Sequence, residues 1–283
     1  MANHYITIAA YKDWENKTQA LRYSADRYGV PLQILFKGGS GTRYELKIER
    51  LYNEYVKDNV MCGDTIIFLD CRDAVFTRPL SEIEAVLESA FAGLTETQII
   101  FQPDTAASFP LRESWFAKRV TLKYKQCANS GAYIYRMPDA KENLHGMYKR
   151  LIRLHKTFTE GYQHLRDGEE YLIPLYEIIK SAMPKQQNVC IDSDQFHVQV
   201  LQSLWDYKSV SIDTEERFFV DDYKGHSFAD LSGLKVPAEL YNNKTAFVFH
   251  APVRYLRSGN GKIKTDGEWF RYVKKIIESG GRK

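Results

Sequence analysis

Two acidic residues directly follow an apolar strand in the first third of the chain. Segment 65–77 reads TIIFLDCRDAVFT, so the strand ends abruptly in Asp70 and Asp73. In an open α/β sheet, ligands bind beyond the carboxyl ends of the strands, so both carboxylates are expected to face the binding crevice. There they can hold Mn²⁺ or Mg²⁺, with diphosphate oxygens in the remaining positions. An isolated D-x-x-D is more often a turn cap, but the preceding strand favours a metal site.

A histidine late in the chain occupies a comparable position. His250 ends the apolar run AFVFH, and its imidazole can complete the metal shell if the fold brings it beside Asp70. A lone histidine after a strand is otherwise usually a satisfied polar residue. The following Gly259, Gly261 and Lys262 can wrap a diphosphate with backbone N–H groups and one cation, although Gly-Asn-Gly is also simply a good turn.

A glycine-rich turn early in the chain is a candidate phosphate contact. Segment 37–47 runs from two glycines into a helix that carries Arg43 and Lys47. It matches neither the P-loop nor the dinucleotide-binding fingerprint, so an ATPase or a dehydrogenase is not supported. The alternative is a loop followed by a solvated helix face.

Two polar segments are candidates for sugar contacts. Asn129 and Ser130 can hydrogen-bond sugar hydroxyls, and the adjacent Gly131 allows close approach. Asp192 or Asp194 can accept hydrogen bonds from sugar or acceptor hydroxyls, and Asp194 can instead be only a helix N-cap. The two aspartates also spell D-x-D, a rival metal motif that ranks second because no long buried strand precedes it.

The elements that must position these residues alternate between strand and helix. Apolar runs predict strands at 5–10, 33–36, 65–69, 98–102 and 132–135, with helices at 14–28, 44–57 and 79–91 between them. The second half predicts helices at 140–158, 169–182 (interrupted by Pro174), 194–204 and 268–278, and a strand at 247–250. The expected fold is α/β, a mainly parallel sheet flanked by helices. We expect one domain over 1–283 with a helical insertion around 140–185.

Composition sets the broad class. The 283 residues are 44% hydrophobic, and 39 Lys+Arg against 36 Asp+Glu leave a net charge of +3, too small to identify a nucleic-acid binder. No signal peptide or membrane span is visible, and the cysteines form no C-x-x-C pair. We expect a soluble protein of a reducing, cytoplasmic compartment, in a bacterial or virus-infected host cell, with no membrane partner.

The order of these segments resembles the glycosyltransferase domain of the procollagen lysyl hydroxylase family and its viral and bacterial relatives, a Rossmann-like GT-A fold. The resemblance is carried by ITIAA, GGSGTRYELK, FLDCRDAVF, NSGAYIY, DSDQF and the late His250. It implies Mn²⁺ on Asp70, Asp73 and His250. It further implies UDP phosphates on Lys47, the transferred sugar near Asn129 and Asp194, and uracil near a set of first-strand residues: Ile8, Ala9, Ala10 and Tyr11.

The expected function is therefore a Mn²⁺-dependent transfer of a hexose from a UDP-sugar to a hydroxyl of a cytosolic acceptor. One candidate acceptor is a hydroxymethylated pyrimidine in DNA, and another is a protein or glycan hydroxyl. DNA is favoured by interleaved cations and aromatics: Arg112, Trp115, Phe116, Lys118, Arg119, Lys123, Tyr124 and Lys125. Other classes left open are a catalytically silent nucleotide-sugar-binding module and a metal phosphoesterase.

Overall fold

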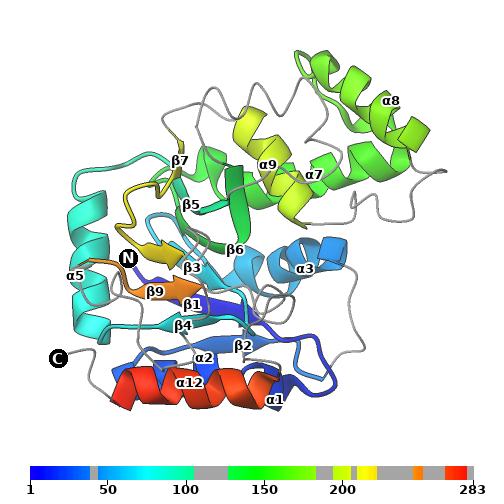
Figure 1. Cartoon of the computed structure of the whole chain (residues 1–283). Coiled ribbons are helices and arrows are strands. Elements are labelled where there is room, and N and C mark those ends of the chain that lie inside the picture. Colours follow the sequence, from blue (N-terminus) through cyan, green and yellow to red (C-terminus); the bar gives the residue numbers. More distant parts are fainter. Residues whose placement is uncertain are drawn as a thin grey trace.

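The computed structural model of the protein describes residues 1–38, 44–104, 127–182, 194–204, 209–221, 245–250 and 265–278. Within these ranges a six-stranded sheet has the order β2-β1-β3-β6-β5-β7, and a three-stranded sheet has the order β4-β9-β8 (Figure 1). In the larger sheet β6 alone runs against its neighbours. The expected mainly parallel α/β fold is confirmed.

The strands of the larger sheet are β1 (Asn3–Ile8), β2 (Gln33–Leu35), β3 (Thr65–Leu69), β5 (Gln98–Asp104), β6 (Cys127–Arg136) and β7 (Val210–Ile212). The smaller sheet consists of β4 (Ala74–Phe76), β8 (Phe219–Asp221) and β9 (Val248–His250). The main helices are α1 (Trp14–Lys17), α2 (Gln19–Tyr28), α3 (Tyr44–Leu51), α5 (Leu80–Phe91), α7 (Gly146–Glu160), α8 (Ile173–Ala182), α9 (Asp194–Leu204) and α12 (Asp266–Glu278).

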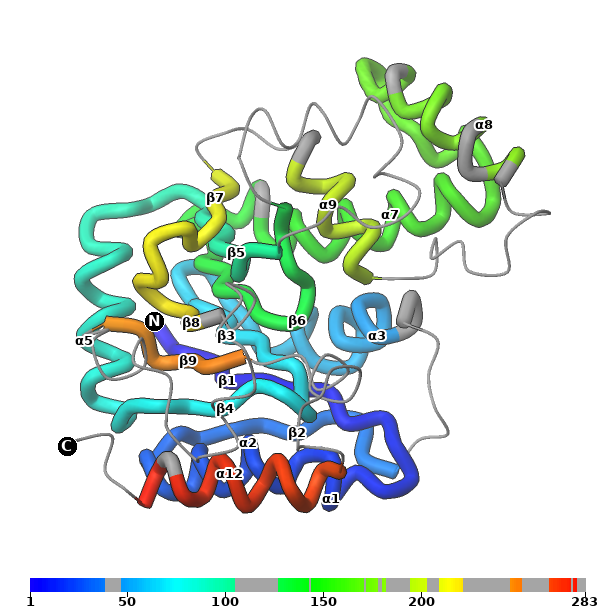
Figure 2. The backbone as a smooth tube through the Cα atoms, viewed as in Figure 1, coloured from blue at the N-terminus to red at the C-terminus, as the bar shows by residue number. Residues whose placement is uncertain are grey.

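The larger sheet is buried on both faces, which explains the apolar run that predicted β3. Along β3, Ile66 and Phe68 join the core beneath α3, α7 and α9, whereas Ile67 and Leu69 join the core beneath α2, α5 and the smaller sheet. Successive side chains point to opposite faces of a strand, so a strand covered on both sides has to be apolar throughout. Figure 2 shows α2 and α12 on one side of the molecule and α7 and α9 on the other.

The smaller sheet is held by α12. Val75 of β4, Val220 of β8 and Phe249 of β9 pack with Trp269 and Val273 of α12 in a third apolar cluster. This layer matters for the site because it fixes β4 against β9. The strands β4, β7 and β8 are too short to show a hydrophobic period and were not predicted, whereas the equally short β2 and β9 lie in the runs 33–36 and 247–250, which were.

The strand expected at 132–135 needs correction. β6 begins at Cys127, so Asn129, Ser130 and Gly131 lie inside the strand and not before it. The register shifts between Phe101 and Gln102, whose partners on β6 are Tyr133 and Asn129. Residues 130–132 therefore form a bulge, and bulges re-aim side chains next to functional sites.

Helix boundaries also differ in places. The helix expected at 14–28 is divided at Thr18, whose hydroxyl donates to the Trp14 carbonyl 2.8 Å away, a contact that bends helices. The helix expected at 44–57 ends as α3 at Leu51 and continues as a π-turn, Tyr52–Val56, and α4, Lys57–Asn59. Pro174 lies in the first turn of α8 and does not interrupt a helix, because proline is tolerated there.

In the segment 140–185, the short 3₁₀ turns Lys141–Asn143, Tyr162–His164 and Glu170–Leu172 accompany α7 and α8. The helix expected at 140–158 thus starts only at Gly146. The single-domain organisation with an insertion here stays a prediction. Among the described residues, no helix has the combined length and apolar character needed to cross a bilayer.

Candidate metal centre

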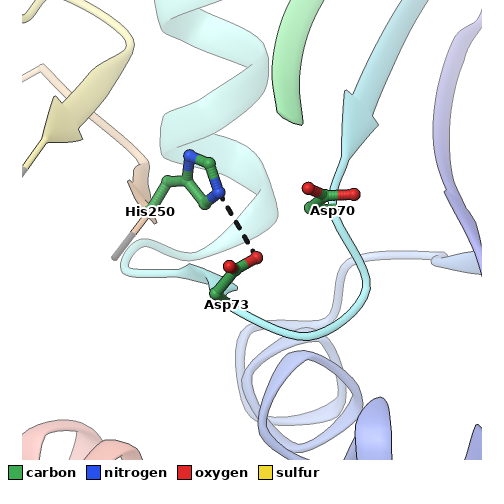
Figure 3. A group of neighbouring side chains, drawn as sticks. All are labelled: Asp70, Asp73 and His250. Atoms are coloured by element: carbon green, nitrogen blue, oxygen red, sulfur yellow. Dashed lines mark ion pairs between the residues drawn. The ribbon is translucent and has the colours of Figure 1, made fainter. Parts of the chain in front are cut away.

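Asp70, Asp73 and His250 lie together, although 177 residues separate the second from the third in sequence. One ligand atom of each lies within 4.8 Å of the others. Their side chains point toward one another from the end of β3, the turn before β4 and the end of β9 (Figure 3). The His250 Nε2 atom is 3.3 Å from Asp73 Oδ1.

Strand pairing explains this meeting. Asp70 follows the last residue of β3, and its N–H donates to the Gly131 carbonyl of β6 at 2.6 Å. Four residues later, at Ala74, the chain enters β4, which pairs antiparallel with β9 so that Ala74 lies opposite His250. Asp73, one residue before Ala74, therefore reaches the imidazole. The turn between the aspartates is tied to α12, because Arg72 Nε donates to Asp266 Oδ1 at 2.8 Å.

The donor set suits Mn²⁺ or Mg²⁺. Adjacent ligands of an octahedral ion at about 2.1 Å lie about 3 Å apart, and opposite ligands about 4.2 Å apart. The 3.3 Å separation of His250 and Asp73 fits adjacent ligands, and a group within 4.8 Å closes on an ion with small side-chain movements. Two carboxylates supply hard oxygen ligands, and the imidazole adds a nitrogen that transition metals accept.

Lys47 connects the cluster to the first residue of α9. Its Nζ donates to Asp70 Oδ1 at 2.9 Å and to Asp194 Oδ2 at 3.4 Å, and it lies 5.0 Å from the centre of the Phe68 ring. Burial alone would lower the pKa of Lys47, but Asp70 and Asp194 outweigh it and hold the pKa well above its ordinary value. The lysine is therefore a fixed cation beside the carboxylates.

The pKa of Asp70 is raised by this arrangement. Burial raises its pKa; Lys47 and His250 act against that shift, and the neighbouring Asp73 and Asp194 add to it. Its side chain is nevertheless 37% exposed, so an ion from solvent can reach it. An additional cation at this point would relieve the repulsion between the carboxylates.

Gly131 packs closely against the cluster. A Cβ on this residue would lie 2.7 Å from His250 Cε1, and 3.0 Å from both Asn129 Oδ1 and Asp70 Oδ2. A close approach to Gly131 was expected from a sugar, and in the structure the side chains of His250, Asn129 and Asp70 occupy that space. Asn129 turns back along the strand, since its Oδ1 accepts the Gly131 N–H at 2.7 Å.

Asp194 begins α9 and faces the cluster. Its Oδ2 contacts Lys47, and its Oδ1 accepts the N–H of Gln195 at 3.0 Å. Only 8% of the side chain is exposed. The residue therefore combines a hydrogen bond to the next backbone N–H with a charge contact to Lys47, and its expected contact with a sugar or acceptor hydroxyl stays a prediction. Asp192 of the rival D-x-D motif lies outside the described residues.

The expected uracil contacts lie at the end of β1 and directly after it. Ile8, Ala9 and Ala10 are buried, and Tyr11 is 36% exposed. The Ala9 N–H donates to the Leu35 carbonyl at 3.0 Å. Among these four side chains, Tyr11 offers the exposed surface that a base would need, and the uracil site stays a prediction.

Other expected residues lie outside the described ranges. These are Arg43, Asp192, the segment 112–125, and the diphosphate candidates Gly259, Gly261 and Lys262. Sequence reasoning missed Gln102, whose Oε1 accepts from His250 Nδ1 at 2.5 Å. The sequence contains the pattern that identified Asp70, which is a polar residue at the end of an apolar strand. In this case the strand reads QIIFQ and its last residue is Gln102.

No protein-family model matches this chain, and no curated protein matches its sequence. Among solved structures, the chain is similar to a glycosyltransferase involved in the glycosylation of the major capsid of PBCV-1, with 9% identity and a TM-score of 0.41 over 98% of this chain and 100% of that one. It is also similar to the glycosyltransferase GlyE of Streptococcus pneumoniae TIGR4, with 12% identity and a TM-score of 0.44 over 99% of this chain. The chain spans 65% of GlyE.

The apo form of GlyE matches at 12% identity and a TM-score of 0.41, over all of this chain and 65% of that one. All three structures are glycosyltransferases, and none is described as a procollagen lysyl hydroxylase. Membership of that family stays a prediction.

Proposed function

We propose that the protein is a Mn²⁺-dependent glycosyltransferase that moves a hexose from a UDP-sugar to the hydroxyl of an acceptor. The observation that carries this proposal is the convergence of Asp70, Asp73 and His250 from three separate strands or strand ends. Lys47 and Asp194 adjoin the same cluster. Metal ligands, a phosphate-binding cation and a buried carboxylate are the parts that such a transfer requires.

Each residue has a distinct task in this proposal. Asp70, Asp73 and His250 hold the ion, which supplies positive charge to the diphosphate as the bond to the sugar breaks. Lys47 exchanges its contact with Asp70 for a phosphate oxygen of the donor. Asp194 then accepts a hydrogen bond from a hydroxyl of the sugar or acceptor. Tyr11 packs against uracil, and Gly259, Gly261 and Lys262 wrap the diphosphate.

The described residues favour this reaction over hydrolysis by a metal phosphoesterase. Two-metal phosphoesterases hold their ions about 3.5–4 Å apart and need a second set of ligands. Within the described ranges, Asp70, Asp73 and His250 form the one group of three or more His, Cys, Asp or Glu side chains with metal-ligand spacing. A catalytically silent binding module is disfavoured because all three side chains of the metal-ligand group are present.

The proposed acceptor is a hydroxymethylated pyrimidine in DNA, with a protein or glycan hydroxyl as the alternative outcome. The support is the interleaving of cations and aromatics in 112–125, which suits phosphate contacts and base stacking. Lys123→Ala and Lys125→Ala should each flatten the log–log salt dependence of DNA binding by about one unit. Lys274→Ala, on the exposed face of α12, is the matched control and should leave the slope unchanged.

A donor and acceptor screen tests the proposed function. The protein is incubated with UDP-sugars, Mn²⁺ and DNA that contains hydroxymethylcytosine or hydroxymethyluracil, and digested nucleosides are analysed by mass spectrometry for added hexose. Asp73→Asn should abolish metal-dependent UDP binding, whereas Asp194→Asn should keep UDP binding and lose transfer. The opposite pattern would move the metal to the second acidic motif. Absence of added hexose, with no DNA binding at low salt, would refute the DNA acceptor.

A further inference from the structure

Gln102 lies directly behind His250, on the side away from Asp73. It is fully buried in the structure, and His250 is 3% exposed. The hydrogen bond between His250 Nδ1 and Gln102 Oε1 measures 2.5 Å, and the opposite ring nitrogen, Nε2, lies 3.3 Å from Asp73 Oδ1. We propose that Gln102 is a positioning residue that holds His250 as the Nδ1-protonated tautomer, so that Nε2 presents its lone pair to the metal. This inference rests on the metal site of the proposed function.

The backbone of β5 gives Gln102 this direction. Side chains alternate along a strand, so Gln102 shares a face with Ile100, and Ile100 packs in the cluster that contains Val248 of β9. The register shift after Phe101 then pairs Gln102 with Asn129, beside the bulge that carries Gly131. Gln102 and His250 are thus placed by two sheets that pack on each other.

The chemistry of the two groups determines the tautomer. An amide oxygen only accepts hydrogen bonds, so the ring nitrogen that faces Gln102 Oε1 has to carry a proton. A neutral imidazole has a single N–H, and the proton on Nδ1 leaves Nε2 with a free lone pair. Metal-bound histidines almost always donate their other N–H to a carboxylate, a carbonyl or water, which fixes the ring and raises its basicity.

The other end of the amide argues against a role in stability alone. Gln102 Nε2 is buried and has no hydrogen-bond partner within the described part of the chain. A buried donor without an acceptor costs free energy, and leucine would fill a similar volume without that cost. The glutamine is therefore better explained by what its oxygen does for His250.

Mn²⁺ titration followed by electron paramagnetic resonance tests the proposal. Gln102→Leu should weaken Mn²⁺ binding by about tenfold or more, as the loss of such supporting contacts typically does. Gln102→Glu keeps an acceptor and should stay within about threefold of the wild type. Gln202→Leu is the matched control, because Gln202 is equally buried but accepts from the Ala128 N–H at 2.9 Å. Gln202→Leu should also leave Mn²⁺ affinity within about threefold.

Long-range ¹H–¹⁵N spectra of the metal-free protein provide a readout independent of metal binding. The His250 signal, assigned by its loss in His250→Gln, should show Nδ1 protonated in the neutral ring of the wild type, and Gln102→Leu should change that pattern. A neutral ring protonated on Nε2 in the wild type would overturn the proposal. So would Mn²⁺ affinity in Gln102→Leu within about threefold of the wild type. If the wild type shows the Nδ1 tautomer but binds no Mn²⁺, the proposed function fails and the tautomer assignment stands.

Discussion

Gly131→Ala tests whether the packing around Gly131 sets the geometry of the metal site. The added methyl group would lie 2.7 Å from His250 Cε1 and 3.0 Å from Asp70 Oδ2. Carbon atoms normally pack at about 3.5–4.0 Å, so the imidazole and the β6 backbone must separate by about 1 Å. Metal–ligand distances tolerate only about 0.2 Å, so the three ligands would no longer fit one ion.

The expected magnitude has two parts. Overpacking a filled site typically lowers the free energy of unfolding by about 1–3 kcal/mol. Mn²⁺ affinity should fall by at least about tenfold, since one of the ligands is displaced directly. Urea unfolding measures the first effect, and Mn²⁺ titration by electron paramagnetic resonance measures the second.

Gly267→Ala is the matched control. Gly267 lies in α12, and nothing is within 4 Å of the position its Cβ would take. Alanine in a helix is favoured over glycine, so this variant should be as stable as the wild type or more stable by up to about 1 kcal/mol, with unchanged Mn²⁺ affinity. If Gly131→Ala folds and binds Mn²⁺ as tightly as Gly267→Ala does, the packing around Gly131 does not set the geometry of the metal site.

Three further changes should separate charge from structure. Lys47→Met removes the cation beside Asp70, so Mn²⁺ alone should bind several-fold more tightly, while UDP should bind more weakly. Calorimetry measures both affinities. A fall in both would contradict this prediction. Burial would raise the pKa of Glu169, but hydrogen bonds from Arg153 and from a backbone N–H outweigh burial and lower the pKa. Arg153 Nη2 lies 2.8 Å from Glu169 Oε1. The contribution of Glu169 to the free energy of unfolding is therefore complete above pH 4.5, the ordinary pKa of the group, and is lost as the pH falls through the lowered pKa. In Glu169→Gln, the free energy of unfolding measured with urea should fall less steeply toward acid pH. An unchanged slope would contradict this. Asp213→Ala leaves three backbone N–H groups, now bonded at 2.8–2.9 Å, without their acceptor and should cost about 3 kcal/mol or more; a loss below about 1 kcal/mol in the same assay would contradict this.

Elements with strong local signals were predicted well from the sequence. The β3 strand Thr65–Leu69 and the α9 helix Asp194–Leu204 have the expected bounds. A strand buried on both faces leaves an uninterrupted apolar run, and α9 starts at an aspartate. Asp70 directly follows the first of these elements and Asp194 begins the second, so the positions of both aspartates followed from local pattern.

The remaining parts depend on contacts between distant segments. The pairing of β4 with β9 brings His250 to Asp73, and neither three-residue strand has a period of its own. Asn129, Ser130 and Gly131 have the composition of a turn, yet they lie within β6. The Ser130 N–H there is bonded by Gln195 Oε1 of α9 at 2.6 Å, a tertiary contact that composition does not reveal.

UDP binding with and without metal tests the central claim most directly. Calorimetric titration of UDP into the wild-type protein should show binding in Mn²⁺ and none in EDTA, because the diphosphate otherwise meets the carboxylates of Asp70 and Asp73. Asp73→Asn should behave in Mn²⁺ as the wild type does in EDTA. Equal UDP affinity in EDTA and in Mn²⁺ would contradict the assignment of this cluster as the metal centre of a glycosyltransferase.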